Sequence, residues 1–177
     1  MVRLTEELVL AKTRAESLAT VKNLNLWGSE LTDVSILQKL VNVEVLSLSV
    51  NKISSLKDFA KCPMLTELYL RKNEIGDIRE VMYLQELKNL SILWLCDNPL
   101  VGASAAEYRK KVICLLPKVT KLDNIDVTEE ERAAAEAGMK DLELDDLPAP
   151  PPAQQQPERP STVPANASRG EGGGGGG

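Results

Sequence analysis

The chain has 177 residues, of which 43% are apolar but only 3% aromatic, so a core must be built from Leu, Val and Ile with very few rings. That length fits one domain with a tail. The sequence contains no histidine, which removes the commonest general base and a common metal ligand and weakens most enzyme hypotheses. The net charge is −5, with 17 bases against 14 acids before Asp123 and 4 bases against 12 acids from there on. This slight basic excess of the body is far below that expected of a nucleic-acid binder.

The N-terminal residues predict a helix that caps the domain. Glu6 and Glu7 stand where a secretory signal would have basic residues before an apolar run, so we do not expect secretion. Thr5 is a candidate N-cap for a helix that extends to about Ala19 and covers the next segment of the chain. The apolar residues of this helix follow helical spacing: Leu4, Leu8, Ala11, Ala15 and Leu18.

The strongest feature of the sequence is a repeat of the pattern LxxLxLxxN. Its four copies begin at Val21, Val43, Leu65 and Leu90, with steps of 22, 22 and 25 residues. This spacing is typical of leucine-rich repeats. The alternating leucines predict short parallel strands with stacked inward side chains, while the rest of each repeat returns along the convex side. We therefore predict an α/β leucine-rich-repeat solenoid with a longer convex helix in residues 77–87, where the long step places three extra residues.

Asparagine ends three copies of the repeat, at Asn51, Asn73 and Asn98, and Ser29 takes this place in the first copy. An inward amide side chain can satisfy backbone groups of two adjacent turns at once. We predict a structural role for these three asparagines, with Ser29 as a smaller substitute at the end of the array.

The C-terminal part of the domain predicts a second cap and then a tail. Residues 108–117 read as a helix stopped by Pro117, followed by a last strand over residues 118–123. Thr128 and Glu131 form a capping-box pattern that opens an alanine-rich helix to about Ala137. We assign residues 1–137 to the repeat domain with its caps. Residues 138–177 are assigned to an acidic, Pro/Gln/Gly-rich tail or linker that we expect to be disordered.

The residues that flank the inward leucines should form an exposed concave face, because strand side chains alternate. Both tryptophans of the chain fall on this face, and Trp, Tyr and Arg are enriched in binding hot spots. The alternative is that a ring folds onto a cap, above all Trp27 near the N-terminal helix. The predicted partner-binding residues are Trp27, Val45, Glu67, Tyr69, Arg71, Ile92 and Trp94.

A second candidate surface is the basic run Arg109, Lys110 and Lys111 on the C-terminal cap. Its simplest interpretation is a solvated helix face, and the alternative is a docking site for an acidic or phosphate-bearing surface. No phosphate-binding loop, carboxylate pair or metal-ligand cluster is apparent, so we expect no cofactor, metal or small-molecule substrate. The three scattered cysteines indicate a reducing compartment. No apolar stretch approaches the ~18 residues of a membrane span.

Over about residues 1–135 the chain resembles a family of small leucine-rich-repeat proteins of cilia and flagella. The more specific matching runs are Leu-Trp-Gly-Ser at 26–29 and Glu-Leu-Tyr-Leu-Arg-Lys-Asn at 67–73. Members of this family reside at basal bodies, pair with a NIMA-related kinase and are linked to DNA-damage responses. They also carry a C-terminal helical oligomerisation module, which this sequence does not show. The resemblance implies a non-enzymatic adaptor of the cytoplasm and cytoskeleton that supports cilium assembly.

Two other proteins with comparable repeats and caps keep the fold but change the function. One is a subunit of a nuclear spliceosomal ribonucleoprotein, which pairs with an RNA-binding protein. The other is a regulatory subunit of phosphatase one, which modulates the specificity of an enzyme. Under all three interpretations the chain binds proteins, with no direct contact to nucleic acid or membrane, and its oligomeric state stays open.

Overall fold

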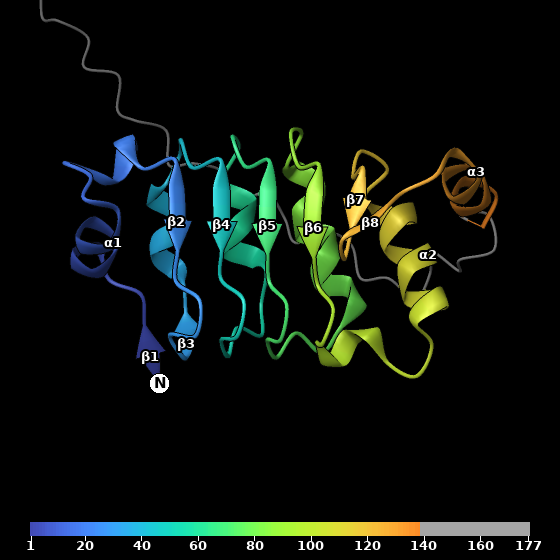
Figure 1. The fold of residues 1–177 in the computed structure, drawn as a ribbon, viewed down its shortest axis with the longest axis horizontal. Coiled ribbons are helices and arrows are strands. Elements are labelled where there is room, and N and C mark those ends of the chain that lie inside the picture. Colours follow the sequence, from blue (N-terminus) through green and yellow to red (C-terminus); the bar gives the residue numbers. More distant parts are fainter. Residues whose placement is uncertain (139–177) are drawn as a thin grey trace, which may run out of the picture.

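The computed structural model describes residues 1–138, which form a solenoid of alternating strands and short helices (Figure 1). One six-stranded sheet runs along the solenoid in the order β2-β4-β5-β6-β7-β8. Strands β2 to β7 are parallel, and β8 is antiparallel to β7. The predicted solenoid with parallel strands is therefore confirmed. Its sheet consists of β2 (Asn23–Asn25), β4 (Val45–Ser47), β5 (Glu67–Tyr69), β6 (Ile92–Trp94), β7 (Lys121–Leu122) and β8 (Ile125–Asp126).

The register of the parallel strands reproduces the sequence repeat residue by residue. The middle residue of each strand pairs with the middle residue of the next, so Leu46 lies between Leu24 and Leu68. These leucines are at most 1% exposed, while the residues on either side of them face out of the core. Because strand side chains alternate, the sheet has one buried face and one outward face, which we call the concave face.

The convex side of each repeat consists of a short 3-10 helix packed behind the sheet. The helices η2 (Ser35–Lys39) and η3 (Lys57–Lys61) have five residues each, whereas η4 (Ile78–Glu86) has nine. The three extra residues of the longest repeat thus lengthen its convex helix, as the sequence predicts. The single phenylalanine of the chain, Phe59, belongs to η3 and is fully buried.

A ladder of three buried asparagines joins successive turns. The Asn73 amide donates to the carbonyls of Leu48 and Leu70, both at 3.0 Å, and its carbonyl oxygen accepts from the Ile53 N–H at 3.1 Å. One side chain therefore satisfies backbone groups of two neighbouring repeats. Asn51 and Asn98 make the equivalent bonds one repeat away on either side. Ser29 instead gives its backbone N–H to Asn51, so the ladder begins at the second copy.

The N-terminal cap is shorter than the sequence indicates. Helix α1 spans Glu6–Thr13, and the Thr5 hydroxyl caps it by accepting from the Leu8 N–H. It ends where Arg14 adopts a left-handed backbone with φ 55°, and the Ala15 N–H then donates to the Thr13 hydroxyl and not to a helical carbonyl. The remaining elements of this cap are η1 (Leu18–Thr20) and the parallel pair β1 (Val2–Arg3) and β3 (Leu31–Asp33).

The C-terminal cap closes the solenoid with two helices around the last strands (Figure 1). Asp123 accepts the N–H groups of Leu95 and Cys96 with one carboxylate oxygen and the Tyr108 hydroxyl with the other. A charged acceptor thus satisfies the backbone of the preceding repeat. The helical elements are η5 (Pro99–Val101), α2 (Ala105–Leu115) and α3 (Glu129–Gly138).

Three sequence predictions concern the C-terminal tail, membrane-spanning segments and metal sites. The predicted tail lies outside the described residues, except for Gly138, which is the last residue of α3. Within residues 1–138, no helix is long and apolar enough to cross a membrane. In the same range, His, Cys, Asp and Glu side chains do not gather into any group that could hold a metal ion.

Replacing Asn73 with alanine should lower the free energy of unfolding by about 1–3 kcal/mol, because buried backbone groups lose their partners. Thermal or denaturant unfolding measures this loss. The matched control is Asn89→Ala, which removes an exposed amide that donates to one carbonyl. Equal stability of the two variants would contradict the role of the ladder.

Replacing Leu93 with alanine should cost about 2–5 kcal/mol, because a fully buried side chain leaves a cavity in the core. The neighbouring substitution Ile92→Ala should cost less, since Ile92 is half-buried on the concave face. Denaturant unfolding of both variants checks the register of the strand. A larger loss for Ile92→Ala would show that the two faces are assigned the wrong way round.

Candidate functional site

The outward residues of the strands lie in rows across the concave face. Ser47, Tyr69 and Trp94 are successive partners in one row, and Val45, Glu67 and Ile92 are successive partners in another. The structure therefore brings five of the seven predicted partner-binding residues together on neighbouring strands. Trp27 and Arg71 follow the ends of β2 and β5, in the next row outward.

Tyr69 and Trp94 form an aromatic pair at the centre of this face. Their ring centroids are 5.1 Å apart and the ring planes meet at 77°, an edge-to-face arrangement. The Tyr69 hydroxyl donates to the Glu67 carboxylate at 2.6 Å. This bond, with burial as a smaller cause, raises the pKa of Tyr69 to about 12, so the tyrosine stays protonated at neutral pH. The pair is half-buried and held in one orientation before any partner arrives.

The indole Nε1 of Trp94 is the one buried side-chain nitrogen or oxygen of residues 1–138 without a hydrogen-bond partner. Buried polar groups are normally paired, so an unpaired donor in a native protein needs an explanation. The Tyr69 ring, which meets Trp94 in an edge-to-face arrangement, offers no conventional acceptor, and a ring face gives an N–H at most a weak contact. Folding alone therefore leaves the N–H of Trp94 without a hydrogen-bond acceptor.

Arg71 is exposed and anchored by one neighbour. Its Nε lies 2.7 Å from the Asp97 carboxylate, and both side chains are more than half exposed. An ion pair of this kind contributes little to stability. It does orient the guanidinium beside the aromatic pair, where the remaining N–H groups can bind a partner's acceptor.

Trp27 stands across the face from the aromatic pair, with 66% of its surface exposed. It does not fold onto the N-terminal cap, which was the alternative considered from the sequence. Between Trp27 and Tyr69 lie two small residues of the second repeat, Ser47 and Ser49, and their size leaves a hollow of about 390 Å³. Aromatic residues and the two serines thus line the same hollow.

Val50 and Lys72 also line this hollow, and the sequence analysis does not predict them. Both stand one place before the ladder asparagine, a position that the strand pattern assigns to the turn. Their backbones have positive φ values of 59° and 55°, which carry the chain around the edge of the face. Gly28 occupies the equivalent place in the first repeat with φ 65° and is the sequence signal that could have revealed this turn.

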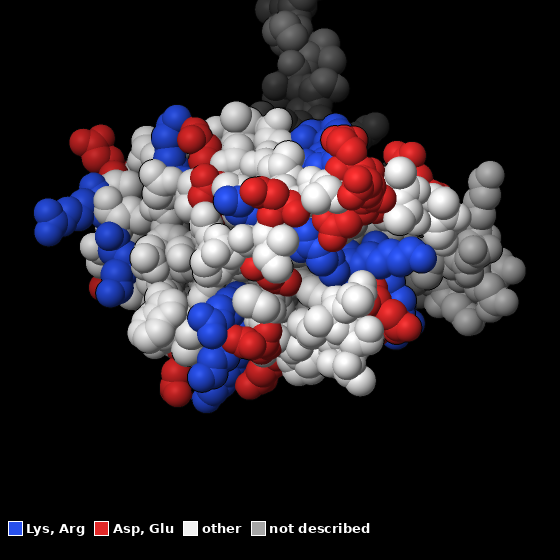
Figure 2. All heavy atoms as spheres, turned by 45° about the vertical axis from the view of Figure 1, so that its right-hand side comes forward, with Lys and Arg blue, Asp and Glu red and all other residues white. Residues whose placement is uncertain are grey.

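The three residues of the second predicted surface have different surroundings in the structure. Lys110 and Lys111 are exposed, but only 17% of the Arg109 side chain is accessible. Arg109 lies 2.6 Å from Glu131 and also donates to the carbonyls of Leu122 and Asp126. It therefore joins α2 to α3 and leaves only the two lysines of the run for a partner. On the face turned toward the viewer in Figure 2, acidic and basic side chains intermingle.

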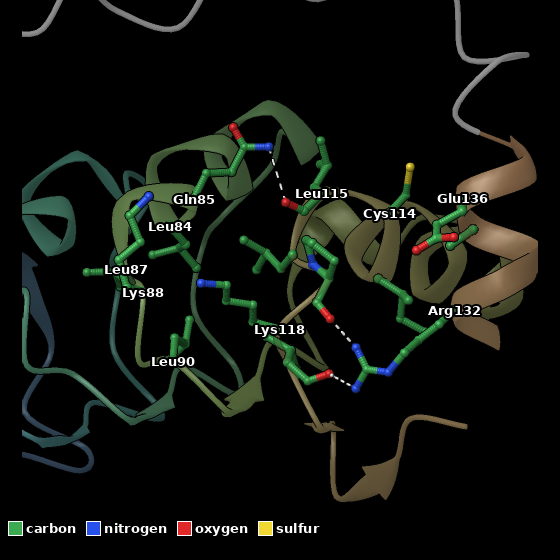
Figure 3. Close-up of a pocket in the computed structure, with 15 residues that line it drawn as sticks. Leu84, Gln85, Leu87, Lys88, Leu90, Cys114, Leu115, Lys118, Arg132 and Glu136 are labelled. Atoms are coloured by element: carbon green, nitrogen blue, oxygen red, sulfur yellow. Dashed lines mark hydrogen bonds between the residues drawn. The ribbon is translucent and has the colours of Figure 1, made fainter. Parts of the chain in front are cut away.

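A second hollow, of about 410 Å³, lies on the C-terminal cap among η4, α2 and α3 (Figure 3). Its lining is mainly apolar and includes five leucines, with Lys88 and Lys118 among the polar residues. The Arg132 guanidinium donates to the carbonyls of Pro117 and Val119 at its edge. These bonds fix α3 against the loop before β7 and mark the hollow as a seam between cap elements.

The side chains of the concave face are suited to noncovalent binding. Rings, hydroxyl groups and cations are present, but the one thiol there is not activated. Burial raises the pKa of Cys96, with the nearby Asp123 and Asp97 carboxylates adding to the effect, so the reactive thiolate is disfavoured. The face is suited to binding side chains of another protein.

Parallel strands repeated at nearly constant spacing around a leucine core define a repeat solenoid, a class of protein that presents an extended binding surface. The sequence model of the leucine-rich repeat family matches residues 30–147, and the chain belongs to that family.

Individual relatives are ciliary by name. The chain is 47% identical over 133 residues to cilia- and flagella-associated protein 410 of Homo sapiens and 46% identical over 133 residues to the Mus musculus protein. The match covers 75% of this chain and 52% and 53% of those relatives, so the chain spans about half their length. Among solved structures, the Drosophila melanogaster SNF/U2A' complex matches with a TM-score of 0.61 at 20% identity, covering 79% of this chain and 94% of that one. This last likeness shows the shared fold alone.

The ion pair between Arg109 and Glu131 should make stability depend on acidity. Hydrogen bonds from Arg109 and from the Thr128 N–H lower the pKa of Glu131 to about 2, against 4.5 for an unperturbed Glu. The stabilisation is therefore complete above about pH 4.5 and is lost as the pH falls through 2. Glu131→Gln should flatten the fall in unfolding free energy across this range, measured by denaturant unfolding. The control Glu129→Gln changes a 96% exposed carboxylate and should retain the wild-type slope.

Proposed function

We propose that this chain is a non-catalytic adaptor of the cilium that binds other proteins through its concave face. The observation that carries the proposal is the 47% identity over 133 residues to a human cilia- and flagella-associated protein. The match covers 75% of this chain and 52% of that relative.

The concave face supports this proposal by its composition. Tyr69, Trp94 and Arg71 are residue types that dominate binding energies in protein interfaces, and they stand side by side. Their positions are preset by the Glu67 and Asp97 carboxylates, so little conformational entropy is lost when a partner binds. A preorganised aromatic and cationic cluster is expected of an adaptor surface.

The partner and the location are proposed from the resemblance to basal-body proteins. We propose a NIMA-related kinase or another basal-body protein as the partner, and support of cilium assembly as the outcome. The chain would then act in the cytoplasm and cytoskeleton, at the base of the cilium. The oligomeric state of the full protein is left open by this proposal.

The alternative functions share the fold and are weaker. The SNF/U2A' complex resembles this chain at 20% identity, which supports the architecture and no particular partner. A role in a spliceosomal complex or in phosphatase regulation would place the chain with different partners, which the same capture experiment would reveal.

Affinity capture from ciliated cells of the source organism tests the proposal, with wild type beside a Tyr69→Ala/Trp94→Ala double variant. We expect the variant to lose a kinase or basal-body protein, because the aromatic contacts are gone. Loss of the edge-to-face contact should cost about 0.5–1.5 kcal/mol of stability beyond the lost burial of the two rings, so a thermal melt confirms folding first.

Tyr83→Ala is the matched control, since it truncates a half-buried tyrosine on the convex side. It should retain the partner. An unchanged set of partners in the double variant would exclude the concave aromatics as the site. Capture of splicing or phosphatase subunits in place of ciliary proteins would refute the ciliary role and leave the fold unaffected.

A further inference from the structure

The turn before each ladder position uses a left-handed backbone in every repeat. The N–H groups at these turns extend the hydrogen bonding between repeats, as when Val50 donates to the Arg71 carbonyl at 2.8 Å and Lys72 to that of Cys96 at 3.0 Å. The fold thus requires this backbone whatever the side chain. The four residues are Gly28, Val50, Lys72 and Asp97, with φ values of 65°, 59°, 55° and 58°.

Val50 is the residue least suited to this conformation. Glycine adopts it freely and aspartate is enriched in it, but a β-branched side chain there is an outlier that costs stability. Core packing does not offset the cost, because Val50 belongs neither to the buried core nor to the apolar residues packed against it. Its side chain is half-buried and lines the hollow of the concave face.

The surroundings of Val50 are apolar on one side and cationic on the other. Trp27 shares the hollow and is mostly exposed, while Arg71 and Lys72 line it as well and no acidic side chain does. Lys72 makes no ion pair with any residue of the range 1–138. The hydroxyls of Ser47 and Ser49 make no side-chain hydrogen bond there and are free to accept or donate.

We propose that the hollow binds an acidic peptide segment of a partner protein, with an apolar side chain of the segment against Val50 and Trp27 and a carboxylate at Lys72. This inference deepens the proposed function and rests on it. Val50 is the positioning contact for the apolar side chain, and the chain retains it at the expense of stability. The charge of the hollow selects acidic over basic segments.

The hollow lies on the outward face of the sheet, so side chains of a peptide segment can enter it from solvent. The backbone groups of the segment can then meet the two serine hydroxyls.

The test uses a random nine-residue peptide library displayed on phage and selected on the full chain. Selected peptides are then titrated by the fluorescence of Trp27 and Trp94, which are the only tryptophans and both belong to the concave face. We expect the selected peptides to carry an acidic residue and a large apolar one.

Val50→Asn separates the two effects, because asparagine accepts a left-handed backbone but offers no branched apolar surface. It should raise the melting temperature and weaken peptide binding about tenfold. Val50→Gly removes the side chain altogether and should weaken peptide binding to a similar extent. Lys72→Glu should weaken binding at least about tenfold and remove most of its salt dependence, whereas Lys61→Glu on the convex helix η3 should bind like wild type.

The outcomes distinguish this inference from the proposed function. Selection of basic or neutral peptides, failure to select any, or equal binding by Val50→Asn would overturn the inference. A Val50→Asn variant that melts lower than wild type would overturn it as well, since the strain would then be absent. In each case, loss of ciliary partners from the Tyr69→Ala/Trp94→Ala variant would still uphold the adaptor role.

Discussion

The asparagine ladder is the interaction on which the other features of the domain depend. Each amide holds the turn of its own repeat and the turn of the preceding one, as Asn73 does for Leu70 and Leu48. This double attachment keeps the strands in register, because a shift of one residue would leave buried backbone groups unpaired. The register in turn places Tyr69 beside Trp94. The binding face is therefore a consequence of the same bonds that hold the solenoid together.

Stability and binding draw on different residues of one strand pattern. The inward leucines form the core, so the outward positions are free to vary without loss of the fold. On this face two small serines lie between large aromatic rings, and this difference in size leaves the hollow. At Val50 the separation breaks down, since the fold requires a left-handed backbone there and the side chain on the face is one that this backbone strains.

The sequence predicts the repeated parts of the structure well and the irregular parts less well. The repeat strands β2, β4, β5 and β6, the long convex helix and the capping box of Thr128 and Glu131 are predictable from local spacing, whereas β1, β3 and β8 are not. The early end of α1 coincides with a left-handed backbone at Arg14 and a bond from the Ala15 N–H to the Thr13 hydroxyl, which helical periodicity does not register. The internal role of Arg109 depends on Glu131, a residue 22 positions away that reaches it only when α3 folds back. The hollow was missed because Val50 and Lys72 reach it from a turn and not from a strand.

The direction of β8 limits how such a protein can lengthen. A new repeat can stack only on a strand that offers a parallel partner in register, and β8 runs opposite to β7 and ends the series. Duplication of a repeat unit would therefore have to insert between existing strands and could not be appended after the C-terminal cap. An insertion beside β4 would move Trp27 away from Tyr69 by about the 4.7–4.9 Å between neighbouring strands. An added repeat would therefore disrupt the hollow. The number of repeats and the kind of ligand that the face can bind would thus change together.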